Sequence, residues 1–368
     1  MEERKQLAEK LRSLRHVRTL IGFDGFVDEI VHVVDMRQDH ECYTRIEDMA
    51  VYAERVKNGC GLSTNMEIVT VARKLGGNGP IFANALKCQN MHITYIGSVG
   101  ENALESVFDE LAEGSDMIGL TDPSHTDAYE FHDGKIIISK LTPFMSVTWQ
   151  RILEKVSFDK FLQLFDEAEL IGMENWTMLP HMSDIWRHVQ AEVTPALTTK
   201  PQDKTMFFDL ADPEKRRPED IRDAIGLIGT FTEQGYKTVL GLNRKEACEI
   251  AELYGAVIDD YKSYPLEELL TYLHEYVRVD YLVVHPVECA CVLHNGAYEE
   301  VGGPYCEKPV LTTGAGDNFN AGFVLGIMNR FSPRECLLCG VYVSGFYVRQ
   351  GRSATSEELA DFLRDFKE

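Results

Sequence analysis

Six short apolar runs, each followed by glycine or polar residues, constrain what this chain can fold into. Segments with helical periodicity separate the runs, which lie at residues 17–23, 92–100, 168–176, 205–212, 238–243 and 280–286. Continuous apolar strands that alternate with helices predict an α/β fold with a mostly parallel sheet covered on both faces. In such sheets ligands bind at the carboxyl ends of the strands, where the polar residues of these runs gather.

Two regions, approximately residues 29–68 and 117–142, break this alternation. They contain the strand-like pieces EIVHVVDM and TDAYEFHDGKIIISKL, the second with a turn expected at Asp133-Gly134. We expect a small antiparallel sheet that projects over the strand ends as a lid, with an exposed face that offers a homodimer contact. The chain has no internal repeat, low-complexity tract or obvious linker, so we expect residues 1–368 to form one domain that carries this lid.

The charge of the chain limits its partners. Lys and Arg number 37 against 59 Asp and Glu, which gives a formal net charge of −22. This acidity argues against binding to nucleic acid or a membrane surface, since both are polyanionic. The charged opening MEERKQLAEKLRSLRH is no signal peptide, no apolar run is long enough to span a bilayer, and the nine cysteines lack a secreted spacing. We therefore expect a cytoplasmic protein with reduced thiols.

A glycine step late in the chain predicts an anion-binding site. Residues 311–323 read LTTGAGDNFNAGF, and the apolar periodicity after the glycines indicates a helix. Amides at a helix N-terminus lack intrahelical partners, and glycine lets an anion approach them, so Gly314, Ala315 and Gly316 form a candidate anion hole. Asp317 beside them is either a general base for an attacking hydroxyl or a cap for the first-turn amides, and this stretch alone leaves both open.

Several motifs in order carry a family resemblance. TTGAGDNFNAGF resembles the C-terminal signature of the ribokinase-like, or PfkB, carbohydrate kinases. GGNGPIFANALKCQNMHITYIGSVG, which covers residues 76–100, resembles the di-glycine motif of that family, and GFDGFVDEI resembles its first-strand segment. GLNRKEA resembles its N-x-x-E motif. The resemblance extends from about residue 18 to residue 351.

The resemblance implies a doubly wound α/β fold with a β lid and transfer of the γ-phosphoryl group of ATP to a sugar-type hydroxyl. By position, Asp317 would be the catalytic base, and Gly314, Ala315 and Gly316 would supply the anion hole. Thr313, together with Gly316, would contact the nucleotide.

Asn243 and Glu246 match the N-x-x-E motif. The resemblance implies that they organise Mg²⁺ and its waters near the phosphates, and oxygen ligands at a strand end suit that cation. The same spacing also fits a helix capping box, with Asn243 as the cap and Glu246 three residues later. The two interpretations are compatible.

The acceptor contacts also follow from the resemblance. Asp28 matches a substrate-binding aspartate after the first strand, and Asp24 lies four residues earlier. Gly77 and Asn78 lie in the di-glycine loop, and Glu174 falls where ribokinases have an acidic sugar contact. Carboxylates suit vicinal hydroxyls because each oxygen accepts a hydrogen bond.

Departures from the family pattern leave alternatives open. Ile81 replaces a usual asparagine, Leu311 replaces the first aspartate of the C-terminal signature, and His285 and Val287 replace a T-x-G pattern beside the nucleotide. A catalytically weak, sugar-sensing relative is therefore one alternative. A nucleoside kinase of the same family is another, with Trp176 or Phe131 stacked on the base. The acceptor, the nucleotide preference and monovalent-cation activation stay open.

Overall fold

The larger of two sheets has the predicted alternation of strands and helices. In the computed structural model, which describes residues 2–366, this sheet has nine strands in the order β14-β13-β12-β11-β10-β9-β1-β5-β6. All neighbouring pairs from β12 to β6 are parallel, while β12, β13 and β14 pair antiparallel at one edge. The strands are β1 (Arg18–Phe23), β5 (His92–Gly97), β6 (Asp116–Gly119), β9 (Leu170–Met173), β10 (Thr205–Asp209), β11 (Lys237–Leu242), β12 (Tyr281–Val284), β13 (Cys289–His294) and β14 (Ala297–Gly302). Each of the six apolar runs coincides with one of the parallel strands, with β11 starting one residue before its run, which confirms that prediction.

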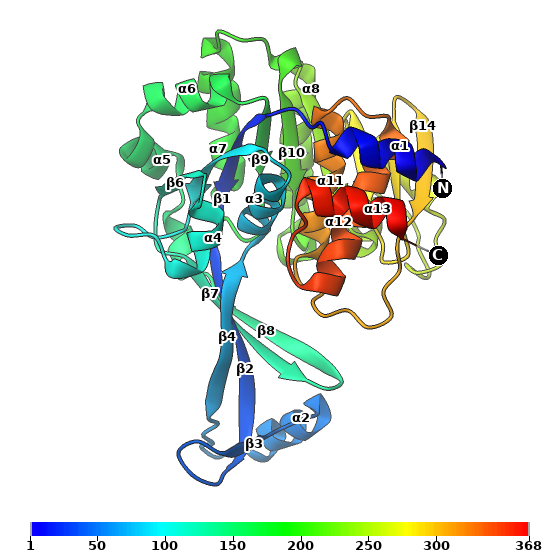
Figure 1. Cartoon of the computed structure of the whole chain (residues 1–368). Coiled ribbons are helices and arrows are strands. Elements are labelled where there is room, and N and C mark those ends of the chain that lie inside the picture. The colour runs from blue at the N-terminus through cyan, green and yellow to red at the C-terminus, as the bar shows by residue number, and fades with distance from the viewer. Residues whose placement is uncertain (1, 367–368) are drawn as a thin grey trace.

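Helices cover both faces of this sheet (Figure 1). Along β10, Phe207 packs in one core with the helices α1, α3, α11, α12 and α13, whereas Phe208 packs in a second core with α5 to α10. Successive side chains of a strand therefore enter opposite cores, and this explains why the strands are apolar along their whole length. The helices are α1 (Glu2–Leu11), α3 (Asn78–Cys88), α4 (Asp109–Ala112), α5 (Trp149–Val156), α6 (Phe158–Glu167), α7 (Met182–His188), α8 (Pro218–Glu233), α9 (Arg244–Leu253), α10 (Leu266–His274), α11 (Ala315–Met328), α12 (Pro333–Gln350) and α13 (Ser356–Asp365).

A smaller sheet projects from this body (Figure 1). Its central strand β2 pairs antiparallel with β3 and β4 and parallel with β7, and β7 forms a hairpin with β8. A helix, α2, packs Met49 and Tyr52 on the side of the sheet that carries Val33 and Phe131. The elements are β2 (Phe26–Arg37), β3 (Tyr43–Arg45), α2 (Met49–Asn58), β4 (Ile68–Gly76), β7 (Ser124–Phe131) and β8 (Gly134–Lys140).

The edges of this sheet differ from the segments expected for the lid. Residues 117–119 belong to β6 of the larger sheet, and β4 continues beyond residue 68 to Gly76. The hairpin turn falls one residue earlier than expected, because Phe131 pairs with Gly134 and leaves His132 and Asp133 as the loop. The general expectation of a doubly wound α/β body with a second, smaller sheet is confirmed. Within residues 2–366, no helix combines the length and apolar character needed to cross a bilayer.

Candidate active site

Polar side chains meet at one edge of the larger sheet. Asp24, Glu174 and Asn243 directly follow β1, β9 and β11, and Asp209 is the last residue of β10. These four strands are neighbours and run parallel, so their carboxyl ends lie together. Sequence reasoning missed Asp209, although its position as the last residue of a buried parallel strand was a usable signal.

Asp24 connects three parts of this edge. Its carboxylate accepts hydrogen bonds from the amides of Asn78 and Gly79 at 3.0 Å each and from the side-chain amide of Asn175 at 2.7 Å. The Tyr95 hydroxyl also donates to the Asp24 backbone carbonyl, at 2.8 Å. Asp24 is fully buried, and this burial raises its pKa to about 6. Its geometry suits anchoring of the N-terminus of α3 rather than direct contact with a ligand.

The di-glycine loop brings Asp28 and Asp24 against the main chain. A Cβ on Gly76 would lie 2.3 Å from the Asp28 carboxyl carbon, and a Cβ on Gly77 would lie 2.8 Å from Asp24 Oδ2. Gly77 also has a φ of 99°, which side chains disfavour. The motif therefore needs glycine at both positions, so that two carboxylates can pack against the loop.

Asp28 lies on β2, where the smaller sheet leaves the body. It is 9% exposed, and burial raises its pKa, while the ammonium groups of Lys74 and Lys135 oppose that rise. Asp28 therefore faces a region where two lysines of the smaller sheet are close.

Asp317 lies in the first turn of α11 and is held by the di-glycine loop. The Asn78 side-chain amide donates to Asp317 Oδ1 at 2.9 Å. The carboxyl is 7% exposed, and its pKa is raised to about 8, chiefly by burial and further by the charge of Asp24. A carboxyl with a pKa near neutral is matched to proton transfer at physiological pH.

Glu174 and Asp209 are two further buried acids of the edge, at 0% and 8% exposure. Burial and neighbouring carboxylates raise the pKa of both well above the usual range. Asn320 donates to Asp209 at 3.1 Å, whereas neither Glu174 oxygen has a hydrogen-bond partner in the part of the chain the structure describes. We call Asp24, Asp28, Glu174, Asp209 and Asp317 the carboxylate cluster.

The start of α11 presents free amides. The N–H groups of Gly314 and Gly316 have no acceptor among the described residues, whereas Ala315 donates to the Thr312 carbonyl at 3.1 Å. The helix runs 14 residues, so its N-terminus carries partial positive charge. Gly314 has a φ of 89°, and a Cβ there would lie 2.8 Å from the Tyr347 hydroxyl. Gly314 and Gly316 thus offer an anion hole, while the Ala315 amide is used within the turn.

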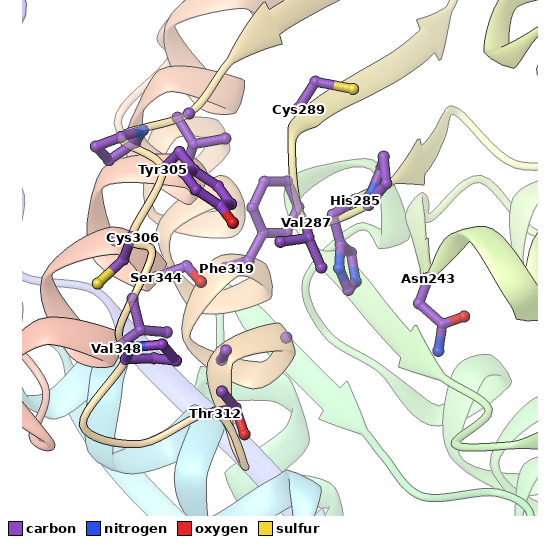
Figure 2. Close-up of a pocket in the computed structure, with 18 residues that line it drawn as sticks. Asn243, His285, Val287, Cys289, Tyr305, Cys306, Thr312, Phe319, Ser344 and Val348 are labelled. Carbon is purple, nitrogen blue, oxygen red and sulfur yellow. The ribbon is translucent and has the colours of Figure 1, made fainter. Parts of the chain in front are cut away.

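A cavity of about 380 Å³ opens on the other side of this helix start. Ala315, Gly316 and Thr312 line it together with apolar residues from β13, α12 and the loop before α11. Figure 2 shows the ring of Phe319 close to Val287 and His285, with Asn243 at the margin. No lysine or arginine of residues 2–366 belongs to this lining. We call it the apolar cavity.

Asn243 and Glu246 form the capping box that the sequence allowed. Asn243 Oδ1 accepts from the Glu246 amide at 2.9 Å, and Glu246 Oε2 accepts from the Asn243 amide at 2.8 Å. Glu246 Oε1 also accepts from the Asp212 amide at 3.0 Å. Within residues 2–366, no group of three or more His, Cys, Asp or Glu side chains is arranged to hold a metal ion. Asn243 reaches the apolar cavity and Glu246 lies behind it, which fits a hydrated cation better than one held directly by protein.

The two aromatic residues considered for base stacking are not available. Trp176 is fully buried, donates to Ser183 Oγ at 2.9 Å and is covered by the Arg216 guanidinium. Phe131 packs against Tyr52 of α2 in the smaller sheet. The expectation that either side chain stacks on a nucleobase was wrong, since both complete apolar cores.

Comparisons with known proteins identify the family. The family model for prokaryotic ketohexokinase matches residues 2–366. A ketohexokinase of Haloferax volcanii is 30% identical over 351 residues, which cover 95% of this chain and 91% of that protein.

Among solved structures, Arabidopsis thaliana ribokinase complexed with ribose and ATP has a TM-score of 0.67 at 14% identity, covering 96% of this chain and 100% of that one. Adenosine kinase of Sinorhizobium meliloti has a TM-score of 0.66 at 18% identity, covering 96% and 99%. At these identities the solved structures show the ribokinase fold alone. The chain belongs to the prokaryotic ketohexokinase family, and it is a carbohydrate kinase with the ribokinase-like fold.

Proposed function

We propose that this carbohydrate kinase transfers the γ-phosphoryl group of ATP to a hydroxyl of a ketohexose, with Asp317 as the general base. One observation carries the proposal. Asp317 is the member of the carboxylate cluster that directly follows Ala315 and Gly316, which line the apolar cavity, and it has a pKa raised to about 8 with Asn78 bound to one oxygen. The name of the Haloferax volcanii relative supports a ketohexose as the acceptor.

The apolar cavity is the proposed nucleotide site. Its lining suits a purine and ribose, and it includes Thr312, Ala315 and Gly316 at the start of α11. Thr313 and Gly314 lie between these residues in the chain, and the free Gly314 and Gly316 amides suit phosphate oxygens. Because the cavity lining lacks cationic side chains within the described residues, main-chain amides and the helix dipole would carry most of the protein's contribution to phosphate binding.

The proposed transfer uses the chain's own groups in a defined order. Asp28 and Asn78 orient the sugar, while Asp24 and Gly77 position the loop that carries Asn78. The ionised Asp317 accepts the hydroxyl proton as the sugar oxygen bonds to the γ-phosphorus. The bond from that phosphorus to the β–γ bridging oxygen breaks, and ADP leaves with the electron pair. Glu174 is too buried for direct sugar contact in this conformation, so we assign it to the support of the cluster.

Mg²⁺ fits this site as a hydrated ion that arrives with the nucleotide. Asn243 at the cavity margin and Glu246 behind it would hold its waters, and the ion would supply neutralisation of phosphate charge. The capping box fixes both side chains before the ion binds, so the same residues would serve the fold and the site.

An acceptor panel tests the proposal. ADP release is measured with D-fructose and other ketohexoses, aldohexoses, ribose and adenosine, and NMR locates the phosphate on the product. We expect the highest kcat/KM with a ketohexose. A preference for adenosine would instead establish the nucleoside kinase alternative, and saturable sugar binding without transfer would establish the sugar-sensing one.

We also propose a homodimer through the smaller sheet. Ile137 and Ile138 on the edge strand β8 are about half exposed, and Val71 on β4 is similarly open. Such apolar strand edges are usually covered. Light scattering should give twice the chain mass, and Ile137→Lys should reduce it to one chain. A monomeric wild-type protein would exclude this contact.

A further inference from the structure

One hydrogen bond joins the smaller sheet to the anion hole. Lys135 Nζ, at the start of β8, donates to Thr313 Oγ1 at 2.9 Å. Thr313 directly precedes Gly314, whose amide is free, and its own carbonyl accepts from the Tyr347 hydroxyl at 2.8 Å. The ammonium group is therefore held one residue from the amides that suit a phosphate.

The register of the sheet directs Lys135 to the acceptor side. Residues 135 and 139 share one face of β8, since they are an even number apart, and Ser139 Oγ lies 3.2 Å from Thr126 Oγ1 on β7. Thr126 is in register with Asp28 on β2. Lys135 and Asp28 thus lie on the same face of the smaller sheet, opposite the face covered by α2.

Lys135 is of interest because few other cationic groups of the described chain are close to the anion hole. The carboxylate cluster on one side consists of acids, and the lining of the apolar cavity on the other side offers no lysine or arginine within residues 2–366. A transferred phosphoryl group spreads its charge over three oxygens, which electrostatic donors stabilise. Lys135 is the cationic side chain that hydrogen-bonds to the segment 312–317 in the described chain.

We propose that Lys135 is a catalytic residue carried by the lid: in the loaded enzyme its ammonium leaves Thr313 and binds a non-bridging oxygen of the transferring γ-phosphoryl group. This inference rests on the proposed function. Lys135 keeps its proton throughout, Asp317 takes the proton of the acceptor, and ADP leaves with the electron pair of the broken bond. Closure of the lid on the sugar would thereby bring both the acceptor contact of Asp28 and the charge of Lys135 to the reaction.

Substitution of Lys135 distinguishes this role from that of a latch which only holds the lid to Thr313. We expect Lys135→Met to lower kcat by about 10²-fold, the size of effect found for one electrostatic donor, with KM for sugar and ATP within about threefold. Lys135→Arg should restore turnover to within about tenfold of wild type. Lys140→Met is the matched control, because Lys140 lies on the same strand, is 66% exposed and pairs with Asp127 instead, so its loss should leave kcat unchanged.

A binding measurement supplies the second readout. Calorimetry compares ADP alone with ADP, aluminium fluoride and sugar, which together mimic the planar phosphoryl group. Lys135→Met should lower the affinity for the mimic by about 10²-fold and the affinity for ADP by less than threefold. A variant with normal kcat, or with equal losses for ADP and the mimic, would overturn the catalytic role and leave a latch. Phosphate transfer by the wild-type protein is measured first, because a protein that transfers phosphate to no sugar would overturn the proposed function itself.

Discussion

The carboxylate cluster and the apolar cavity meet at the first turn of α11, yet their side chains differ in chemical character. The cluster gathers three acids at strand ends, one on β2 and one in the first turn of α11, and burial raises the pKa of each one. The cavity is lined mainly by apolar side chains and glycine, and its hydrogen-bonding side chains are Asn243, His285, Tyr305, Thr312 and Ser344. A hydroxyl compound needs many acceptors, whereas a polyanion is repelled by carboxylates.

The difference shows how one helix start can serve two ligands. The Asp317 side chain is bound by Asn78 on the side of the cluster, while Ala315 and Gly316 line the cavity. The base and the anion hole are thus consecutive residues of the same turn. Substitutions on either side of this turn should therefore separate acceptor chemistry from nucleotide binding.

The largest separation is expected for Asp317→Asn. Loss of the base should lower kcat by about 10²- to 10⁴-fold, the usual contribution of general base catalysis, while ADP affinity changes less than twofold. Single-turnover kinetics and calorimetry measure the two quantities. Asp159→Asn is the control, because Asp159 also lies in the first turn of a helix, α6, but is exposed. Turnover within tenfold of wild type would remove Asp317 from the role of base.

Asp28→Asn should act on the acceptor alone. A hydrogen bond to a charged group contributes about 1.5–3 kcal/mol, so we expect kcat/KM for the ketohexose to fall about 10- to 100-fold with an unchanged KM for ATP. Initial-rate kinetics with each substrate varied in turn provide the measurement. An increase in the KM for ATP of similar size would mean that the two sides are not separate.

A pH profile sharpens the comparison without a substitution. Since the pKa of Asp317 is raised to about 8, its carboxyl is mostly protonated at pH 7 and mostly ionised at pH 9. A base must be ionised to accept a proton, so kcat/KM for the sugar should rise about tenfold between these values. ADP affinity should stay level over the same range, because no acid lines the apolar cavity within the described residues. A rate that stays flat, or that falls as the pH rises, would contradict the assignment.

The sequence predicted the parts of this site that depend on local patterns. The strand ends carry the expected polar residues, and Asn243 with Glu246 forms the capping box that its spacing allowed. The helix expected after the glycine step is present, although α11 begins within that step, at Ala315. Each of these follows from neighbouring residues, so strand, turn and cap chemistry are enough to find them.

The remaining features depend on distant contacts. Lys135 meets Thr313 only through the register of the smaller sheet, and Trp176 is buried in an apolar core, where Ser183 and Arg216 contact it. The amide of Ala315 donates to the Thr312 carbonyl in a local turn, and the glycine-rich sequence does not show which of its amides will be used in this way. None of these contacts can be predicted from a single sequence, because none of them depends on a fixed spacing along the chain.

The smallest effect is expected at His285, where the family pattern has a threonine. Its ring lies 4.7 Å from that of Phe319, and burial lowers its pKa to about 4, so it is neutral at physiological pH. His285 can therefore give the nucleotide one neutral hydrogen bond and a packing surface, worth about 1 kcal/mol. We expect His285→Ala to raise the KM for ATP about three- to fivefold and to leave the KM for sugar unchanged.

The exposed His274 at the end of α10 provides the control for this substitution. A neutral ring has no charge to lose between pH 6 and 8, so His285 should cause no inflection in the KM for ATP over that range. The pH profiles of wild type and His285→Ala should therefore have the same shape. An inflection near pH 6.5 that disappears in the variant would mean that the histidine binds phosphate as a cation. The cavity would then hold its own positive charge, and the contrast between the two sides of α11 would be one of position rather than of charge.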